Sequence, residues 1–235
     1  MVWQLFQYDQ ANTIANSAVL AGFGDGVCLA LSMKWCVRRK AKQNSLAFNQ
    51  SVMREDQKVE IANWMTSTQD RVIEDLMNHP GHPNPLLNTG YKYKDDDGDP
   101  ISTVDSVRGQ INNMRAYANR LEKMSQWARS NGMVLLDDKV GFSNNLLPPQ
   151  WVSQLIDAAF RLSTPPLLGI IALTGPDDGH ALAYELTQSG HISFFDPNFG
   201  EFRSNGKDDF LPWFLNHLIQ NYPELDQHWW VVQFR

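Results

Sequence analysis

The chain has 235 residues and a formal net charge of −6 at pH 7. A negative net charge argues against a DNA- or RNA-binding protein and against anchoring on anionic lipid through a basic patch. No apolar run approaches the length needed to span a bilayer, so no transmembrane segment is expected. The first residues show neither a basic n-region nor a long apolar h-region, and we therefore expect no cleavable signal peptide.

The hydrophobic pattern predicts helices early in the chain and mostly strands later. Helices are expected at residues 13–21, 28 to about 42, about 51–78, about 103–130, 148–161 and 208–221. Strands are expected at residues 133–136, 167–173, 180–186, 191–195, 200–203 and 228–234. Helices followed by an antiparallel sheet predict an α+β domain. We expect one domain over residues 1–235, with a helical insertion at about 43–165 and a sheet-bearing half at about 166–235.

Cys28 follows a glycine-rich turn and begins the first long predicted helix. Unpaired N–H groups and the positive end of the dipole at a helix N-terminus favour thiolate over thiol. Cys28 is therefore a candidate nucleophile, although a small buried structural cysteine fits the same pattern. Cys36 lies farther along the same helix, at about 12 Å, which is too far for a disulfide. Both thiols are expected to be free.

A histidine and an acid are expected together at one edge of the sheet. His180 begins a predicted strand, and Asp196 ends the next strand 16 positions later. If these strands are antiparallel neighbours, the start of one lies beside the end of the other. The carboxylate would then fix the imidazole tautomer and leave the other ring nitrogen facing the thiol. His191 is the competing histidine, and it could pair with Asp177 or Asp178.

Other histidines and acids carry no predicted site. His217 and His228 are expected to be ordinary surface or half-buried residues. His79 and His82 lack partners at a metal-binding spacing, so they are expected in a turn. The acidic run at 95–99 has a misplaced glycine and no closing glutamate, which predicts a solvated loop instead of a calcium site.

Three short segments carry a family resemblance. They are Gly-Val-Cys-Leu-Ala-Leu-Ser at 26–32, Gly-His-Ala-Leu-Ala at 179–183 and Phe-Phe-Asp-Pro-Asn-Phe-Gly-Glu-Phe at 194–202. In this order and spacing they resemble the YopT-like cysteine proteases, bacterial virulence effectors with a papain-like fold. The resemblance implies that Cys28 is the nucleophile, His180 the general base and Asp196 the orienting acid. This chemistry needs no metal or organic cofactor.

One segment departs from the family pattern. Papain-like enzymes usually place a Gln or Asn side chain a few residues before the cysteine, whereas residues 22–26 contain no amide. The backbone N–H of Cys28 can supply one oxyanion-hole donor. Asn12, Asn16 or another backbone N–H could supply the second, and Asp25 could do so only if protonated. No side-chain donor is therefore assigned.

The resemblance implies a secreted effector that hydrolyses a peptide bond of a host or target-cell protein, acting in the target-cell cytosol. Some family members cleave prenylated Rho-type GTPases, so a substrate with a basic segment such as a small GTPase tail is one expectation. A chaperone or immunity protein is another expected partner. Two alternatives stay open: a papain-like peptidoglycan amidase or endopeptidase acting in the periplasm of a rival bacterium, and a non-catalytic effector that binds a host protein.

Overall fold

The computed structural model describes residues 1–20, 27–43, 45–52, 54–63, 121–122, 124–142, 148–161, 163–175, 179–225 and 228–235. The chain divides into two compact units, Met1–Asn63 with Trp127–Arg235, and Trp64–Gln126. The seven strands of the sheet and the three residues of the predicted site all belong to the first unit. The single domain with a helical insertion at about 43–165 stays a prediction.

Several expectations lie outside the described residues. They concern the glycine-rich segment 22–26, the histidine pair at 79 and 82, the acidic run at 95–99, and the acids at 177 and 178. Within the described part of the chain, no helix is long and apolar enough to cross a membrane.

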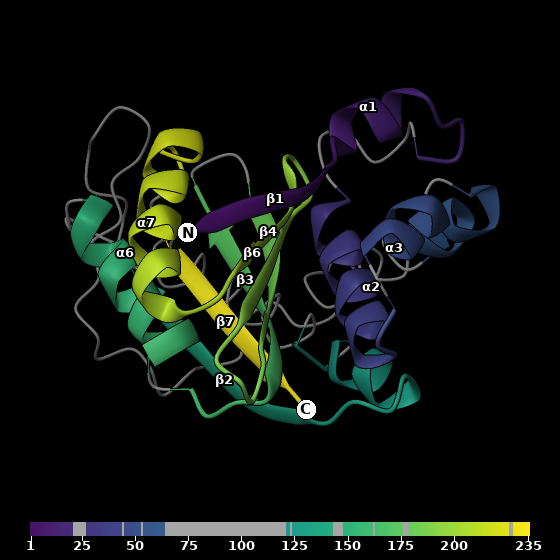
Figure 1. Ribbon diagram of the computed structural model, residues 1–235. Helices are drawn as coiled ribbons and strands as arrows, with labels where there is room; N and C mark the ends of the chain where they lie inside the picture. Colours follow the sequence, from purple (N-terminus) through teal and green to yellow (C-terminus); the bar gives the residue numbers. More distant parts are fainter. Residues whose placement is uncertain are drawn as a thin grey trace, which may run out of the picture. The chain divides into compact units, whose positions relative to one another are not determined.

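A seven-stranded antiparallel sheet is the centre of the first unit (Figure 1). Its strands, in order across the sheet, are β1 (Val2–Gln7), β6 (Gly200–Ser204), β5 (Ile192–Asp196), β4 (Gly179–Leu186), β3 (Leu167–Thr174), β7 (His228–Phe234) and β2 (Leu135–Phe142). Antiparallel pairing holds throughout. The predicted α+β class with an antiparallel sheet is therefore confirmed.

The two edge strands differ from the prediction. β1 was not predicted, because it is stabilised by pairing with β6 about 200 positions away in the sequence, and no local pattern reveals such a partner. β2 begins later and runs farther than the predicted strand at 133–136. Its central Asp-Asp-Lys run interrupts the apolar alternation, as is common in edge strands, where charges discourage pairing with other chains.

The helices cover both faces of the sheet. They are α1 (Gln10–Ala15), α2 (Cys28–Lys40), α3 (Ser45–Val52), α6 (Pro148–Ile156), which continues into the π-helical turn η2 (Asp157–Arg161), and α7 (Lys207–Asn221). Residues 55–63, 121–122 and 124–130 are also helical. The predicted helices at about 51–78 and about 103–130 otherwise fall mostly outside the described residues. Figure 1 shows α2 and α3 on one side of the sheet and α6 and α7 on the other. The predicted helices at 28 to about 42 and 208–221 are confirmed as α2 and α7 to within two residues at each end. The predicted helix at 148–161 is confirmed in extent, but its last five residues form η2 instead of continuing α6.

Helix α1 begins three residues earlier than the predicted helix at 13–21. Asp9 is its N-cap, and the carboxylate of Asp9 accepts a hydrogen bond from the backbone N–H of Asn12 at 3.2 Å. An acidic N-cap of this kind satisfies a first-turn donor and so fixes where the helix starts. The predicted position was therefore wrong, although a short helix is present.

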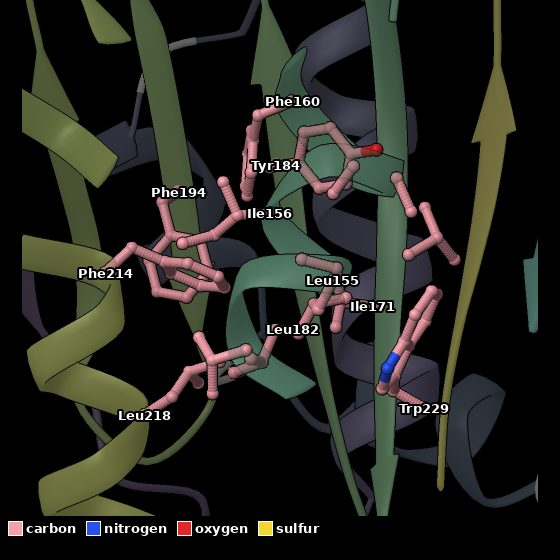
Figure 2. Close-up of a cluster of buried hydrophobic side chains, with 14 of the residues drawn as sticks. Leu155, Ile156, Phe160, Ile171, Leu182, Tyr184, Phe194, Phe214, Leu218 and Trp229 are labelled. Atoms are coloured by element: carbon pink, nitrogen blue, oxygen red, sulfur yellow. The ribbon is translucent and has the colours of Figure 1, made fainter. Parts of the chain in front are cut away.

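Apolar side chains fill the layer between the sheet and the helices α6 and α7 (Figure 2). Those contributed by the strands stand at alternate positions, because successive side chains of a strand point to opposite faces, and the others come from α6, η2 and α7. The labelled members are Leu155, Ile156, Phe160, Ile171, Leu182, Tyr184, Phe194, Phe214, Leu218 and Trp229. Full burial of one such side chain contributes about 1.5 to 3 kcal/mol to folding, so this layer holds α7 firmly on the sheet.

Helix α2 is fixed on the opposite face by specific contacts. The Trp35 ring stacks on Phe195 of β5 with the ring centroids 6.1 Å apart, and its Nε1–H donates to the buried Glu201 carboxylate at 2.9 Å. One helical turn earlier, the Ser32 hydroxyl donates to the backbone carbonyl of Ala181 at 3.0 Å. These contacts set the position of the N-terminus of α2, and therefore of Cys28, relative to β4 and β5.

The first residue of β6, directly after the turn that follows β5, must be glycine. Gly200 has φ of +114°, and a Cβ there would lie 2.0 Å from the backbone carbonyl oxygen of Phe6. We predict that Gly200→Ala lowers the free energy of unfolding by about 3 kcal/mol or more, because backbone strain adds to a collision with β1.

Gly190→Ala is the matched control for this prediction. Gly190 has φ of +85°, but a Cβ there would meet nothing within 4 Å, so the change should cost only about 1 kcal/mol. Urea unfolding of the two variants measures the difference. Equal costs would contradict the steric account of Gly200.

Candidate active site

Cys28 is the first residue of α2 and is buried. The N-cap residue, Val27, makes no side-chain hydrogen bond to the first turn. The first-turn N–H groups and the positive end of the helix dipole therefore act on the sulfur without a competing side-chain acceptor at the cap. This is the environment in which protein thiols become nucleophiles.

His180 and Asp196 lie together at one end of the sheet. Their strands β4 and β5 pair antiparallel, so the start of β4 lies beside the end of β5. His180 Nε2 is 3.0 Å from Asp196 Oδ1, and both side chains are buried. A side-chain hydrogen bond also links His180 to Cys28. The structure thus brings all three predicted site residues together, with Nδ1 as the ring nitrogen left for the thiol.

Electrostatics favour a charged pair in this site. Burial alone would lower the pKa of His180, but hydrogen bonds and charge interactions with Asp196 and Cys28 outweigh it and raise that pKa to about 10. Burial alone would raise the pKa of Asp196, yet the hydrogen bonds from His180 and His217 hold it well below its usual range. A carboxylate and an imidazolium therefore coexist at neutral pH.

Three further donors converge on the same carboxylate. His217 Nε2 lies 2.8 Å from Oδ2 of Asp196, and the Tyr222 hydroxyl lies 2.8 Å from each carboxylate oxygen. The backbone N–H of Asn198 donates to Oδ1 at 2.9 Å. Asp196 is fully buried, so its charge is stabilised by these donors together with His180, without contact with solvent.

The Tyr222 hydroxyl is held as a donor. Burial and the neighbouring Asp196 charge raise the pKa of Tyr222, so its phenol keeps its proton. The Asn198 side-chain amide donates to the Tyr222 oxygen at 3.2 Å, and Gln10 Nε2 donates to the Asn198 side-chain oxygen at 2.8 Å. This chain directs the hydroxyl hydrogen to the carboxylate. The Tyr222 ring also stacks on His180, with the ring centroids 4.7 Å apart.

The expectation that His217 is an ordinary surface or half-buried residue was wrong. His217 is buried and contacts Asp196. A signal was present, because His217 falls on the apolar stripe of α7 between Phe214 and Leu218, both fully buried. A polar residue on such a stripe needs a hydrogen-bonding partner in the core. Nothing in the local sequence indicates that the partner is Asp196.

The other candidates lie apart from the site. His191 is at the turn end of the β4–β5 hairpin, opposite the end that carries Asp196, and its Nδ1 lies 3.0 Å from the Ser189 hydroxyl. Asn16, directly after α1, donates from its side-chain amide to the Asn12 side-chain oxygen at 2.7 Å, so these two candidate oxyanion donors are hydrogen-bonded to each other. The second donor of the oxyanion hole therefore stays unassigned.

Cys36 is a structural thiol. It is buried beneath β3, with its sulfur 3.8 Å from the backbone oxygen of Gly169, and burial raises its pKa. Both cysteines are free, as predicted. Among the described residues, no group of three or more His, Cys, Asp or Glu side chains is placed to hold a metal ion.

The fold and this geometry define a class. A cysteine at a helix N-terminus, with a histidine and an aspartate on neighbouring antiparallel strands, is the arrangement of papain-like cysteine peptidases. Comparison with known proteins then gives the family. A model described as Peptidase_C58, Yersinia/Haemophilus virulence surface antigen, matches residues 2–235. The chain belongs to this family, and the resemblance predicted from its sequence is confirmed.

Two curated relatives and one solved structure illustrate the similarity. The cysteine protease yopT1 of Yersinia enterocolitica is 29% identical over 138 residues, and the cysteine protease YopT of Yersinia pestis is 30% identical over 137 residues. Each match covers 52% of this chain but 40% of the relative. The crystal structure of the Pseudomonas avirulence protein AvrPphB has a TM-score of 0.57 and 15% identity, covering 90% of this chain and 93% of that chain. The structural match supports the fold.

The raised His180 pKa predicts a pH-dependent stability. A group whose pKa rises from 6.5 in the unfolded chain to about 10 contributes fully below pH 6.5, and its contribution is lost as the pH rises toward 10. We predict that the unfolding free energy falls over this interval in the wild-type protein and much less in His180→Ala. Urea unfolding at a series of pH values measures the difference, with His191→Ala as the histidine control.

The opposite sign applies to Asp196. Its depressed pKa gives a contribution that is present above the ordinary aspartate value of 3.8 and is lost as the pH falls below it. In Asp196→Asn the free energy of unfolding should therefore fall less steeply at acid pH than in the wild-type protein. Identical pH curves for wild type and both site variants would contradict the proposed charge pair.

Proposed function

We propose that this protein is a cysteine protease of the YopT-like effector type that hydrolyses a peptide bond through Cys28, His180 and Asp196. The observation that carries the proposal is the position of His180, hydrogen-bonded to the Asp196 carboxylate through Nε2 and to the Cys28 thiol. Membership of the Peptidase_C58 family and the relatives named cysteine protease support it.

The reaction follows from these atoms. The Cys28 thiolate attacks the amide carbonyl carbon, forming a C–S bond while the carbonyl electrons move to oxygen. The Cys28 backbone N–H, which has no intrahelical acceptor at this position, can stabilise that oxyanion. The His180 imidazolium protonates the leaving nitrogen as the C–N bond breaks. His180 then takes a proton from water, which attacks the thioester and releases the acid and the thiolate.

The substrate class is part of the proposal. We propose a target-cell protein as substrate and secretion into that cell as the route, because the relatives are named cysteine protease and avirulence protein. A net charge of −6 favours a basic partner segment, and a small GTPase tail is the first candidate to test. A chaperone or immunity protein would accompany a secreted enzyme of this kind.

Thiol alkylation of the native protein tests the activated nucleophile. We predict that a thiol-reactive probe labels Cys28 of the native protein at neutral pH, whereas buried Cys36 reacts only after unfolding. His180→Ala should abolish this reactivity at neutral pH, and His191→Ala should leave it unchanged. If Cys28 is labelled only at high pH, both in the wild-type protein and in His180→Ala, the hydrolase proposal is contradicted.

Substrate cleavage is the second test. The wild-type protein is incubated with target-cell lysate, and new N-termini are identified by mass spectrometry against a Cys28→Ala control. On the cleaved substrate we predict that His180→Ala lowers kcat/KM by on the order of 10³ or more. Cleavage of peptidoglycan stem peptides alone would favour the amidase alternative. Protein capture by wild type and Cys28→Ala alike, without cleavage, would favour a non-catalytic effector.

A further inference from the structure

We infer that His217 is a positioning residue, a second histidine that holds the Asp196 carboxylate for His180 as a neutral donor whose tautomer is set by Asn221. The inference rests on the proposed function, because the orientation of Asp196 matters to catalysis only if His180 is the base.

The two histidines bind opposite oxygens of one carboxylate. His180 Nε2 lies 3.0 Å from Oδ1 of Asp196, and His217 Nε2 lies 2.8 Å from Oδ2. The terminal torsion of an aspartate side chain has a broad energy well, so the orientation of the carboxylate depends on the donors around it. His180, the Asn198 N–H and the Tyr222 hydroxyl contact Oδ1, whereas His217 joins the Tyr222 hydroxyl at Oδ2. His217 therefore helps to fix the plane of the carboxylate, and with it the direction in which His180 presents its remaining nitrogen.

The contacts of His217 define which of its nitrogens carries the hydrogen. Asn221 Nδ2 lies 3.2 Å from His217 Nδ1 and donates to the His217 backbone carbonyl at 2.8 Å. An amide nitrogen can only donate, so Nδ1 of His217 accepts and carries no hydrogen. The hydrogen is therefore on Nε2 and points at Asp196. Because His217 is neutral, it does not compete with the His180 imidazolium for the negative charge of the Asp196 carboxylate.

Aromatic rings hold the His217 side chain in this orientation. Its ring stacks on Trp213 with centroids 4.9 Å apart and meets Phe199 edge-on at 5.1 Å. The titratable groups placed against it are Asp196 at the end of β5 and Tyr222 after α7, whose ring centroid is 6.2 Å away. The ring is thus confined by packing, and its one short polar contact across the sheet is with Asp196.

Two substitutions of His217 separate positioning from packing. His217→Leu removes the donor, and we expect kcat to fall about 10- to 100-fold with little change in KM, as for other orienting residues around a reacting group. The rate of Cys28 alkylation plotted against pH should change at high pH, where His180 loses its proton; we call this change the alkaline limb. We expect it to move to lower pH in His217→Leu, because the His180 imidazolium is less well stabilised. His217→Gln keeps an Nε2 donor and should restore activity to within about threefold of wild type.

A third variant tests the tautomer without touching the buried ring. Asn221→Asp replaces the amide donor by an acceptor, which draws a hydrogen onto Nδ1 and charges His217. The alkaline limb should again move to lower pH, because two imidazolium rings now share Asp196. Gln220→Glu, which adds the same charge at an exposed neighbouring position, is the control and should leave the profile unchanged.

The outcomes distinguish this inference from the proposed function. A wild-type protein without His180-dependent reactivity of Cys28 would overturn the proposed function and the inference with it. A reactive wild type, with His217→Leu and Asn221→Asp showing unchanged kcat and unchanged pH profiles, would overturn the inference alone. A purely structural role for His217 predicts lower melting temperatures but an unaltered profile for the folded protein.

Discussion

The buried carboxylate of Asp196 is the constraint on which the rest of the site depends. A carboxylate charge taken out of water is destabilised by several kcal/mol unless hydrogen bonds or an opposite charge replace the lost hydration. Here His180, His217, Tyr222 and the backbone N–H of Asn198 supply them. The same donors that keep Asp196 ionised also fix its orientation, and an ionised Asp196 is what keeps the His180 ring charged in a buried environment.

The fold supplies these groups from both faces of one sheet. Helix α2 lies on one face and presents Cys28 at its N-terminus, whereas α7 lies on the other face and contributes His217, with Tyr222 directly after its last residue (Figure 1). The paired ends of β4 and β5 lie between them and carry His180 and Asp196. Each helix is fixed by its own packing, α2 through Trp35 and Ser32, and α7 through the apolar layer of Figure 2. The site therefore depends on two separate packing layers.

The turn residues, helix propensities and apolar runs of the sequence predicted those elements that interactions between near neighbours in the chain determine. The start of α2 at Cys28 follows from glycines before good helix formers, and the β4–β5 hairpin follows from two apolar strands joined by a short turn. Their pairing alone predicts that His180 and Asp196 lie together. The catalytic roles of Cys28, His180 and Asp196 stay a prediction.

What sequence reasoning missed depends on contacts between distant elements. β1 is stabilised by pairing with β6, and His217 reaches Asp196 only because α7 packs on the sheet. The buried position of His217 on the α7 stripe could be predicted from its helical spacing, but its partner could not. The stacking of Tyr222 on His180 likewise depends on where the chain turns after α7.

The charge state of His180 is tested most directly by nitrogen-15 NMR of the imidazole rings across pH, with His180→Ala used to assign the His180 signals. A His180 ring protonated on both nitrogens at neutral pH and titrating near pH 10 is the predicted result. A neutral His180 ring that titrates near the ordinary value of 6.5 would contradict the charge pair on which the site depends.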